Sequence, residues 1–232
     1  MNTLHQTALV SETVVSSRAV GKRRLRSVLL GVMSFMLVGQ AQGDILSTTG
    51  AMTPISSPVS FLEGDTESST IIGILDEGIT FLSAGIFVNA VGPGTHTGSS
   101  APPILIPAGA MVHTYIVHFD PAGGLASLTG SVTFDPGETI IGIQTHTPYL
   151  DTSDAVVGDP SATYPTGLLE FRAFETLPGT DTVTVPPGLG SASFALFAEL
   201  SIDQARIVTI PEPAALSLLA LGGLAVIRRR RR

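Results

Sequence analysis

The chain of 232 residues contains no cysteine and no tryptophan, and each absence excludes a class of function. Without cysteine there is no thiol nucleophile, no zinc–thiolate site and no protein-bound iron–sulfur cluster. A domain of ordinary size needs no disulfides to hold its core together, even in an oxidising compartment. Sugar-binding surfaces often stack their ligand on tryptophan, and here only Tyr115, Tyr149 and Tyr164 could take that role.

Positive charge is almost missing from the middle of the chain. Of the 12 Lys and Arg residues, five precede residue 27 and five end the chain, which leaves only Arg172 and Arg206 between them. The same middle part holds 17 of the 19 acidic residues, so its formal charge is −15 although the whole chain carries −7. Such a body argues against binding to nucleic acid or to anionic lipid. It fits divalent cations, a salty medium or plain solubility.

The first part of the chain has the three regions of a secretory signal peptide. A basic region at Lys22–Arg26 precedes the apolar run Val28–Val38, whose 11 residues are too few to span a membrane. The small residues at Ala41–Gly43 form an acceptable cleavage site, so we expect a signal peptide over residues 1–43 and Asp44 as the first mature residue. The stretch before Lys22 is longer than an n-region needs, so either the n-region is long or the true start lies downstream.

The last 22 residues combine three elements in order: Pro-Glu-Pro at Pro211, Glu212 and Pro213, an uncharged apolar run, and five arginines. The prolines break any structure that runs into them. The apolar run Ala214–Ile227 has 14 residues. As a helix it would be about 21 Å long, short of the roughly 30 Å hydrocarbon core of a bilayer. It can therefore pause in a membrane but makes a poor permanent anchor.

The residues expected to enter the membrane as a short helix are Ala214, Leu216, Leu218, Leu219, Leu221, Leu224, Val226 and Ile227. The residues expected to stop on the cytoplasmic side are Arg228, Arg229, Arg230, Arg231 and Arg232. A simple tail anchor is the alternative interpretation. A buried core helix that ends in five arginines is a weaker one.

These three elements together resemble the PEP-CTERM sorting signal of exported bacterial proteins. The resemblance implies that a membrane-embedded exosortase recognises Pro211, Glu212 and Pro213 and processes the tail after a transient association with the inner membrane. It implies a final location at the cell surface or in the extracellular matrix, and it makes extracellular polysaccharide a candidate partner. It covers about a tenth of the chain and is an address rather than an activity.

A stretch of the body is similar to a domain found in exported PEP-CTERM proteins, for which no activity is assigned. The resemblance is carried by Tyr115–Pro121, Gly130–Asp135, Ile141–Ile143, Leu150–Gly158 and Tyr164–Pro165. It implies a shared fold and leaves the biochemical function open.

The body has the pattern of an all-β domain. Short runs rich in Ile, Val, Thr and Phe alternate with clusters of Gly, Pro, Asp and Ser. The expected strands are Ser60–Glu63, Thr70–Leu75, Ile79–Val91, Met111–Phe119, Ala126–Phe134, Thr139–Thr145, Leu168–Phe174, Thr182–Val185, Ser191–Glu199 and Ala205–Ile210. About ten short strands at this spacing predict an antiparallel β-sandwich with jelly-roll-like connections.

We expect three parts: a signal peptide over 1–43, an acidic β-sandwich over 44–209 and a sorting signal over 210–232. The sandwich would be flanked by an N-terminal signal helix and a C-terminal short hydrophobic helix. Inside the body one short helical turn is expected, capped by Thr152–Asp154 and ended by Gly158.

Asp151, Asp154 and Asp159 form the only candidate metal site, since clustered carboxylates and loop carbonyls are the ligands that Ca²⁺ prefers. The segment lacks the spacing of an EF-hand loop. The alternative is that these side chains cap turns and helix starts. His113 and His118 are five residues apart in one expected strand, so they point to opposite faces and cannot share an ion.

No catalytic motif stands out. The sequence has no Gly-x-Ser-x-Gly elbow and no nucleotide-binding glycine pattern, and Glu170 and Glu175 would face apart on one strand. We therefore expect a non-enzymatic surface or matrix protein without catalytic residues or a cofactor. A calcium- or polysaccharide-binding module that uses the loops around Asp151–Tyr164 is one alternative. An extracellular hydrolase that cleaves a polymer between two carboxylates is another.

Overall fold

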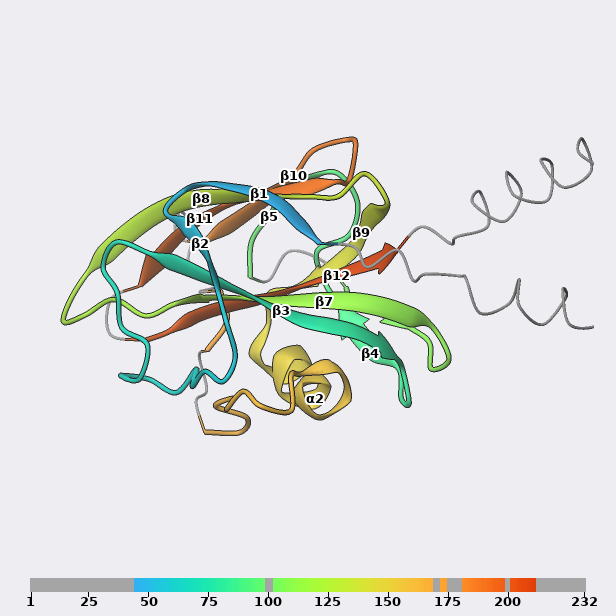
Figure 1. Ribbon diagram of the computed structural model, residues 1–232, viewed down its shortest axis with the longest axis horizontal. Coiled ribbons are helices and arrows are strands. Elements are labelled where there is room, and N and C mark those ends of the chain that lie inside the picture. The colour runs from blue at the N-terminus through green and yellow to red at the C-terminus, as the bar shows by residue number, and fades with distance from the viewer. Residues whose placement is uncertain (1–43, 99–101, 169–171, 175–180, 199–200, 212–232) are drawn as a thin grey trace, which may run out of the picture. The chain divides into compact units, whose positions relative to one another are not determined.

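The computed structural model describes residues 44–98, 102–168, 172–174, 181–198 and 201–211, and it shows a body built almost entirely of strands (Figure 1). The strands are β1 (Ile45–Gly50), β2 (Met52–Ile55), β3 (Ile72–Phe81), β4 (Ile86–Val88), β5 (Gly94–His96), β6 (Ile104–Ile106), β7 (Met111–Phe119), β8 (Ala126–Phe134), β9 (Glu138–Gln144), β10 (Thr182–Val185), β11 (Ser191–Ala198) and β12 (Asp203–Pro211). The helix is α2 (Thr147–Val157). The expected signal helix and tail helix lie outside the described residues.

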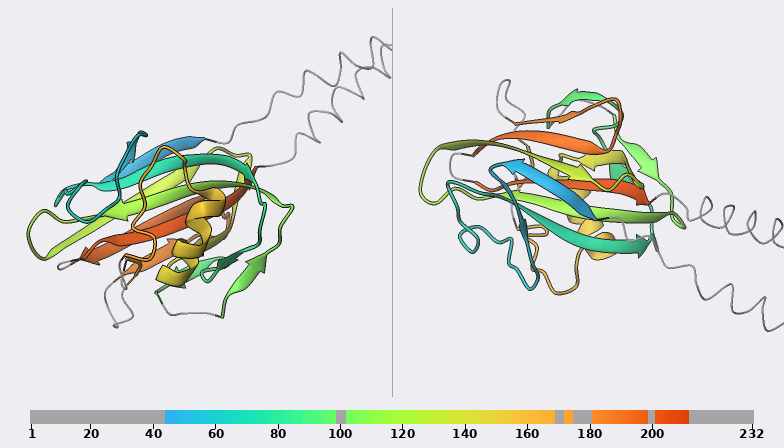
Figure 2. Two further views of the ribbon diagram at one scale, coloured as in Figure 1. Left: turned by 90° about the horizontal axis from the view of Figure 1, so that it is seen from below. Right: turned by 45° about the horizontal axis from the view of Figure 1, so that its top comes forward.

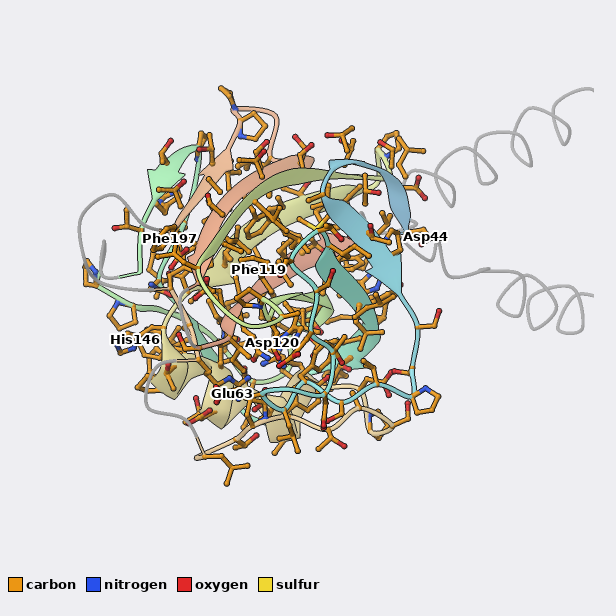
Figure 3. All side chains as sticks on the ribbon, turned by 90° about the vertical axis from the view of Figure 1, so that its left-hand side faces the viewer. Asp44, Glu63, Phe119, Asp120, His146 and Phe197 are labelled. Carbon is orange, nitrogen blue, oxygen red and sulfur yellow. The ribbon has the colours of Figure 1, made fainter. Side chains whose placement is uncertain are left out.

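Ten of these strands form two five-stranded sheets that pack face to face as a sandwich (Figure 2). The first sheet has the order β1-β8-β11-β10-β5 and is the upper layer in Figure 1. The second sheet has the order β2-β3-β7-β12-β9, and β4 pairs with β6 in a small separate ribbon. Figure 3 views the sandwich from the end at which β7 finishes, with Phe119 and Asp120 labelled.

The two sheets follow different burial patterns, and the sequence explains both. In β11 every second residue is buried, as expected for a strand with one face on the core and one toward water. In β7 every residue after Met111 is buried. The second sheet is therefore covered on both faces, by the first sheet on one side and by α2 on the other (Figure 1).

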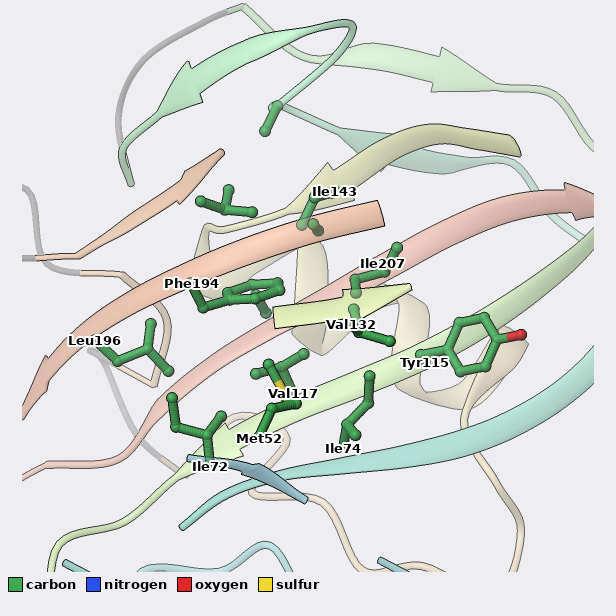
Figure 4. Close-up of a cluster of buried hydrophobic side chains, with 14 of the residues drawn as sticks. Met52, Ile72, Ile74, Tyr115, Val117, Val132, Ile143, Phe194, Leu196 and Ile207 are labelled. Atoms are coloured by element: carbon green, nitrogen blue, oxygen red, sulfur yellow. The ribbon is translucent and has the colours of Figure 1, made fainter. Parts of the chain in front are cut away.

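The main core lies between the sheets. Its residues come from the inward-facing positions of both layers, among them Met52, Ile72, Ile74, Tyr115, Val117, Val132, Ile143, Phe194, Leu196 and Ile207 (Figure 4). Side chains of this size each contribute roughly 1.5–3 kcal/mol when fully buried. Two smaller clusters lie on the outer face of the second sheet. One holds Val157 of α2 against Val112 and Val208, and the other holds Leu150 of α2 against Leu75 and Ile116.

The helix begins earlier than predicted. α2 starts at Thr147 with a proline in its first turn, where the missing N–H costs nothing, instead of being capped by Thr152–Asp154. Its end is as expected, since the amide of Gly158 donates to the carbonyl of Asp154 over 3.0 Å.

The predicted strands Met111–Phe119, Ala126–Phe134 and Thr182–Val185 are confirmed with the same bounds. The predicted strand Ser60–Glu63 is wrong, because this segment forms turns with an isolated bridge at Ser60. The described part of Leu168–Phe174 is likewise no strand.

The expectation of a purely antiparallel sandwich needs one correction. β2 pairs with β3 in parallel. The segment between them crosses back, so β3 begins at the same end of the sheet as β2. All the other strand pairs of the described residues are antiparallel. The jelly-roll connectivity stays a prediction.

Candidate functional site

The two arginines of the body are both buried beneath α2. Arg206 of β12 pairs with Glu77 of β3 through two bonds, from Nε to Oε2 over 2.7 Å and from one terminal nitrogen to Oε1 over 2.8 Å. The same terminal nitrogen reaches Oδ1 of Asp154 at 2.9 Å. The other terminal nitrogen bonds to the hydroxyl of Ser153. The ring of Tyr164 lies below the guanidinium, and its hydroxyl donates to Glu77 over 2.6 Å.

Arg172 completes this arginine network from the other side of Asp154. Its terminal nitrogens bond to the two oxygens of Asp154 at 2.7 and 3.1 Å, and one of them also reaches Asp151 at 2.9 Å. Both arginine side chains are fully buried. Because no other Lys or Arg occurs between Asp44 and Ile210, no guanidinium or ammonium side chain of the body reaches the surface.

Opposite charges nearby shift the pKa values of Arg206 and Asp154. Burial lowers the pKa of Arg206, but the neighbouring Glu77 and Asp154 carboxylates outweigh it and raise that pKa above its usual range. Burial likewise raises the pKa of Asp154, but the Arg172 and Arg206 guanidinium groups bring it below its usual range. The ion pairs that Asp154 of α2 makes with Arg172 and Arg206 fasten the helix to the second sheet.

The structure does not bring the three predicted calcium ligands together. Asp151 and Asp154 lie against the Arg172 guanidinium, whose positive charge opposes a bound cation. Asp159 instead accepts bonds from the backbone amide and hydroxyl of Ser161, at 2.8 and 2.7 Å, which is the turn-capping role. In the part of the chain that the structure describes, no group of three or more His, Asp and Glu residues is arranged to hold a metal ion.

A second buried ionic cluster surrounds His113 of β7. Its Nδ1 lies 2.5 Å from Oε1 of Glu138 and its Nε2 lies 2.6 Å from Oδ1 of Asp76. The hydroxyls of Tyr115 and Thr209 donate to the other oxygen of Glu138, over 2.9 and 2.8 Å. The cluster joins β3, β7, β9 and β12 near the end of the second sheet.

The His113 cluster resembles a catalytic arrangement in composition but not in electrostatics. Burial lowers the pKa of His113, but its bonds to Asp76 and Glu138 outweigh it and raise the pKa to about 9. Near neutral pH the imidazole is thus protonated, and a protonated ring cannot act as a general base. Tyr115 is fully buried beside it, so it cannot stack on a sugar.

His118 lies on the opposite face of β7, as its spacing from His113 predicted. It packs on Phe61 with ring centroids 5.1 Å apart, and Nδ1 lies 3.0 Å from Nε2 of Gln204. Burial and the nearby charge of Arg172 lower the pKa of His118 to about 3. The two histidines of one strand therefore carry different charges.

The outer face of the first sheet carries a row of hydroxyl side chains that we did not predict from the sequence. The row crosses all five strands with one residue from each, in the order Thr49, Ser131, Ser193, Thr184 and Thr95. The hydroxyls of Thr49 and Ser131 are 2.6 Å apart, and those of Thr95 and Thr184 are 2.9 Å apart. A sequence signal was present, since Ser and Thr occupy alternate positions in β8 and β11.

This hydroxyl row crosses an open hollow of about 360 Å³, which is lined by residues of β1, β8, β10 and β11. The five strands of the first sheet contain no Asp, Glu, Lys or Arg. An otherwise strongly acidic body thus presents one uncharged face whose side chains both donate and accept hydrogen bonds.

The sorting motif begins inside the fold. β12 ends at Pro211, which pairs with Glu138 of β9, so the first proline of the motif is the last residue of the sheet. Glu212, Pro213, the apolar run and the arginines lie outside the described residues. Within those residues, no helix is both long and apolar enough to cross a membrane.

Comparison with known protein families identifies the C-terminal segment. Residues 209–232 match the PEP-CTERM protein-sorting motif. Neither the curated proteins nor the solved structures gave a match to this chain. The motif indicates an exported protein that an exosortase sorts to the cell surface, and the resemblance of the body to a domain of such proteins stays a prediction.

Proposed function

We propose that this chain, which carries a PEP-CTERM sorting motif, is a non-enzymatic surface or matrix protein that an exosortase releases from a transient membrane-bound form. The observation that supports this most is the direct junction between β12 and the motif at Pro211. Because the last strand ends where the motif begins, the tail can direct the whole β-sandwich to the outer side of the membrane without unfolding it. The 14-residue apolar run is too short for lasting residence there.

A non-enzymatic role is supported by the state of the polar clusters. Both guanidinium groups of the arginine network are buried and ion-paired, and His113 is held as a cation between two carboxylates. Neither cluster offers a group that is both exposed and poised to exchange a proton. The hydrolase alternative would need such a pair of groups around a substrate.

The sorting role is tested by replacing Pro211, Glu212 and Pro213 with alanine and following the protein in cell fractions. The wild-type chain should pass from the membrane fraction to the surface or medium. The variant should accumulate in the membrane fraction, because the enzyme no longer recognises the tail. A Glu63→Gln variant, changed at an exposed residue of the body, is the matched control and should behave as the wild type. Equal release of the triple variant would overturn the proposal.

A second candidate function is the binding of a neutral polysaccharide on the hydroxyl row. Hydroxyls recur there about every 4.8 Å from strand to strand, which suits repeated hydrogen bonding to a polymer of hydroxyl groups. The absence of charge from the five strands favours a neutral chain over an acidic one, which the −15 body would repel.

Affinity electrophoresis of the protein through gels that contain a neutral glucan or an acidic polymer tests this candidate. The neutral glucan should retard the wild-type protein. A variant with Thr49→Val, Ser131→Ala, Ser193→Ala and Thr184→Val should run as if no glucan were present. The control removes exposed hydroxyls elsewhere, by Ser69→Ala and Thr70→Val, and should keep the retardation. Retardation that survives the fourfold change would place the binding elsewhere.

A further inference from the structure

Three neighbouring strands of the second sheet reach the same end of the sandwich, where the sorting tail starts. Phe81, the last residue of β3, pairs with Met111, the first residue of β7. On the other side of β7, Thr209 of β12 pairs with His113, so β12 reaches the same end and finishes at Pro211. We call the exposed residues Phe81, Met111 and Ile210 the tail-end rim.

The tail-end rim is apolar and exposed. The exposed fractions are 70% for Phe81, 50% for Met111 and 40% for Ile210. The loops that adjoin the rim, residues 82–85 and 107–110, contain only Leu, Ser, Ala, Gly and Pro. Large apolar side chains grouped beside uncharged loops mark a surface that contacts something other than water.

The opposite end of the sandwich has the reverse character. Its loops carry Glu63, Asp65, Glu67 and Asp120 (Figure 3 labels Glu63 and Asp120). At the tail end the second sheet contributes the buried Glu138 and the partly exposed Asp76, both paired with the His113 cation, and Asp44 and Asp135 sit on the neighbouring corner of the first sheet. The end from which the tail departs is thus the one that can approach a membrane without carrying the main acidic surface toward it.

The segment between β12 and the apolar run is so short that an inserted tail holds the rim close to the membrane. Only Glu212 and Pro213 separate Pro211 from the apolar run, so the end of β12 lies within about 10 Å of Ala214. The polar layer on each side of a bilayer is only about 5–8 Å thick. If the 14-residue apolar run enters the bilayer as a helix, its length of about 21 Å falls short of the roughly 30 Å core, and this mismatch draws the end of the sandwich further in.

We propose that the tail-end rim rests in the interface of the lipid bilayer while the tail is uncut, so that the membrane, rather than a second protein, covers Phe81 and Met111. This rests on the proposed insertion of the tail. Release of the protein by processing then lifts the rim out of the bilayer. The rim orients the sandwich with its acidic end away from the membrane and presents Pro211 at a fixed depth.

The lack of native tryptophan makes the rim directly testable, because one introduced tryptophan is the only one in the protein. Phe81→Trp reports on the rim. Leu125→Trp, at a residue that is 62% exposed in the loop after β7, reports on the opposite end and is the matched control. Leu219→Trp reports on the tail. Each variant of the full chain from Asp44 to Arg232 is reconstituted into phosphatidylcholine vesicles with and without brominated acyl chains.

The tryptophan of the Phe81→Trp variant should shift to the blue on reconstitution and lose intensity with brominated lipid, while that of Leu125→Trp does neither. Quenching in Leu219→Trp without quenching in Phe81→Trp would overturn the rim and leave tail insertion standing. No quenching in Leu219→Trp would remove the premise of tail insertion itself.

Two further outcomes identify another occupant and also overturn the proposal. A blue shift of Phe81→Trp that grows with protein concentration in detergent, without vesicles, indicates a second copy of the chain. A shift that requires added exosortase indicates that the enzyme, not the lipid, covers the rim.

Discussion

The outer faces of the two sheets use polar side chains in opposite ways. On the second sheet, Arg206, Glu77 and the α2 residue Asp154 are buried and paired with one another. On the first sheet, the hydroxyl row is open to solvent and carries no charge. One face has used its polar groups to attach a helix, and the other has left them available.

The two faces should therefore contribute differently to the stability of the body. Breaking a buried ion pair is costly, because the remaining partner becomes an uncompensated charge inside the protein. An exposed row of hydroxyls contributes little to folding and keeps its bonding capacity. The same substitution should therefore have different consequences on the two faces.

The largest expected effect is on the second sheet. Arg206→Met leaves Glu77 as a buried charge with no cation beside it, and we expect unfolding to become easier by about 3–5 kcal/mol. Urea unfolding followed by circular dichroism measures the change. A double variant, Arg206→Met with Glu77→Gln, removes the orphaned charge and should recover part of the loss. A loss below about 1 kcal/mol for the single variant would mean that the network does not fasten α2.

The next effect is the pH dependence of the His113 cluster. The pKa of His113 is about 9 in the folded protein and 6.5 in a free side chain. The stabilisation of the folded state by its protonated ring is therefore complete below pH 6.5 and is lost as the pH rises through 9. The loss should lie between about 3 and 4 kcal/mol, at about 1.4 kcal/mol for each unit of pKa. His113→Gln should remove this slope of stability between pH 6.5 and 9, whereas the control His96→Gln should keep it. An unchanged slope in His113→Gln would contradict the charged state assigned to the cluster.

The smallest effect on stability is expected on the first sheet. Thr49→Val and Ser193→Ala should each change the free energy of unfolding by no more than about 0.5 kcal/mol, because water replaces the lost partners. If these substitutions lower the free energy of unfolding as much as Arg206→Met does, the two faces do not differ in their contribution to stability. Urea unfolding under the same conditions measures the free energy of unfolding for the first-sheet variants and for Arg206→Met.

Local pattern predicted the strands in which burial alternates or runs unbroken. β8 and β10 show this, since each has apolar residues at every second position. β1 was missed because its residues Ser47, Thr48 and Thr49 carry no apolar period, and only pairing with β8 makes it a strand. Ser60–Glu63 was overpredicted because the buried Phe61 gives a turn the appearance of a strand.

The candidate sites were partly visible in the sequence. Arg172 and Arg206 stood out as the only cations of the body, but their partners could not be named. Glu77 is 129 residues from Arg206, and Thr49 is 82 residues from Ser131. Such contacts depend on sheet order and register, which local propensity does not encode. The sorting motif needed no fold because its three elements are adjacent in the chain.

We propose above that the C-terminal tail is removed from the mature protein. Intact mass spectrometry of the wild-type protein released from its native host tests it most directly. We expect a chain that begins at Asp44 and lacks Arg228–Arg232. A released protein that still ends at Arg232 would contradict it.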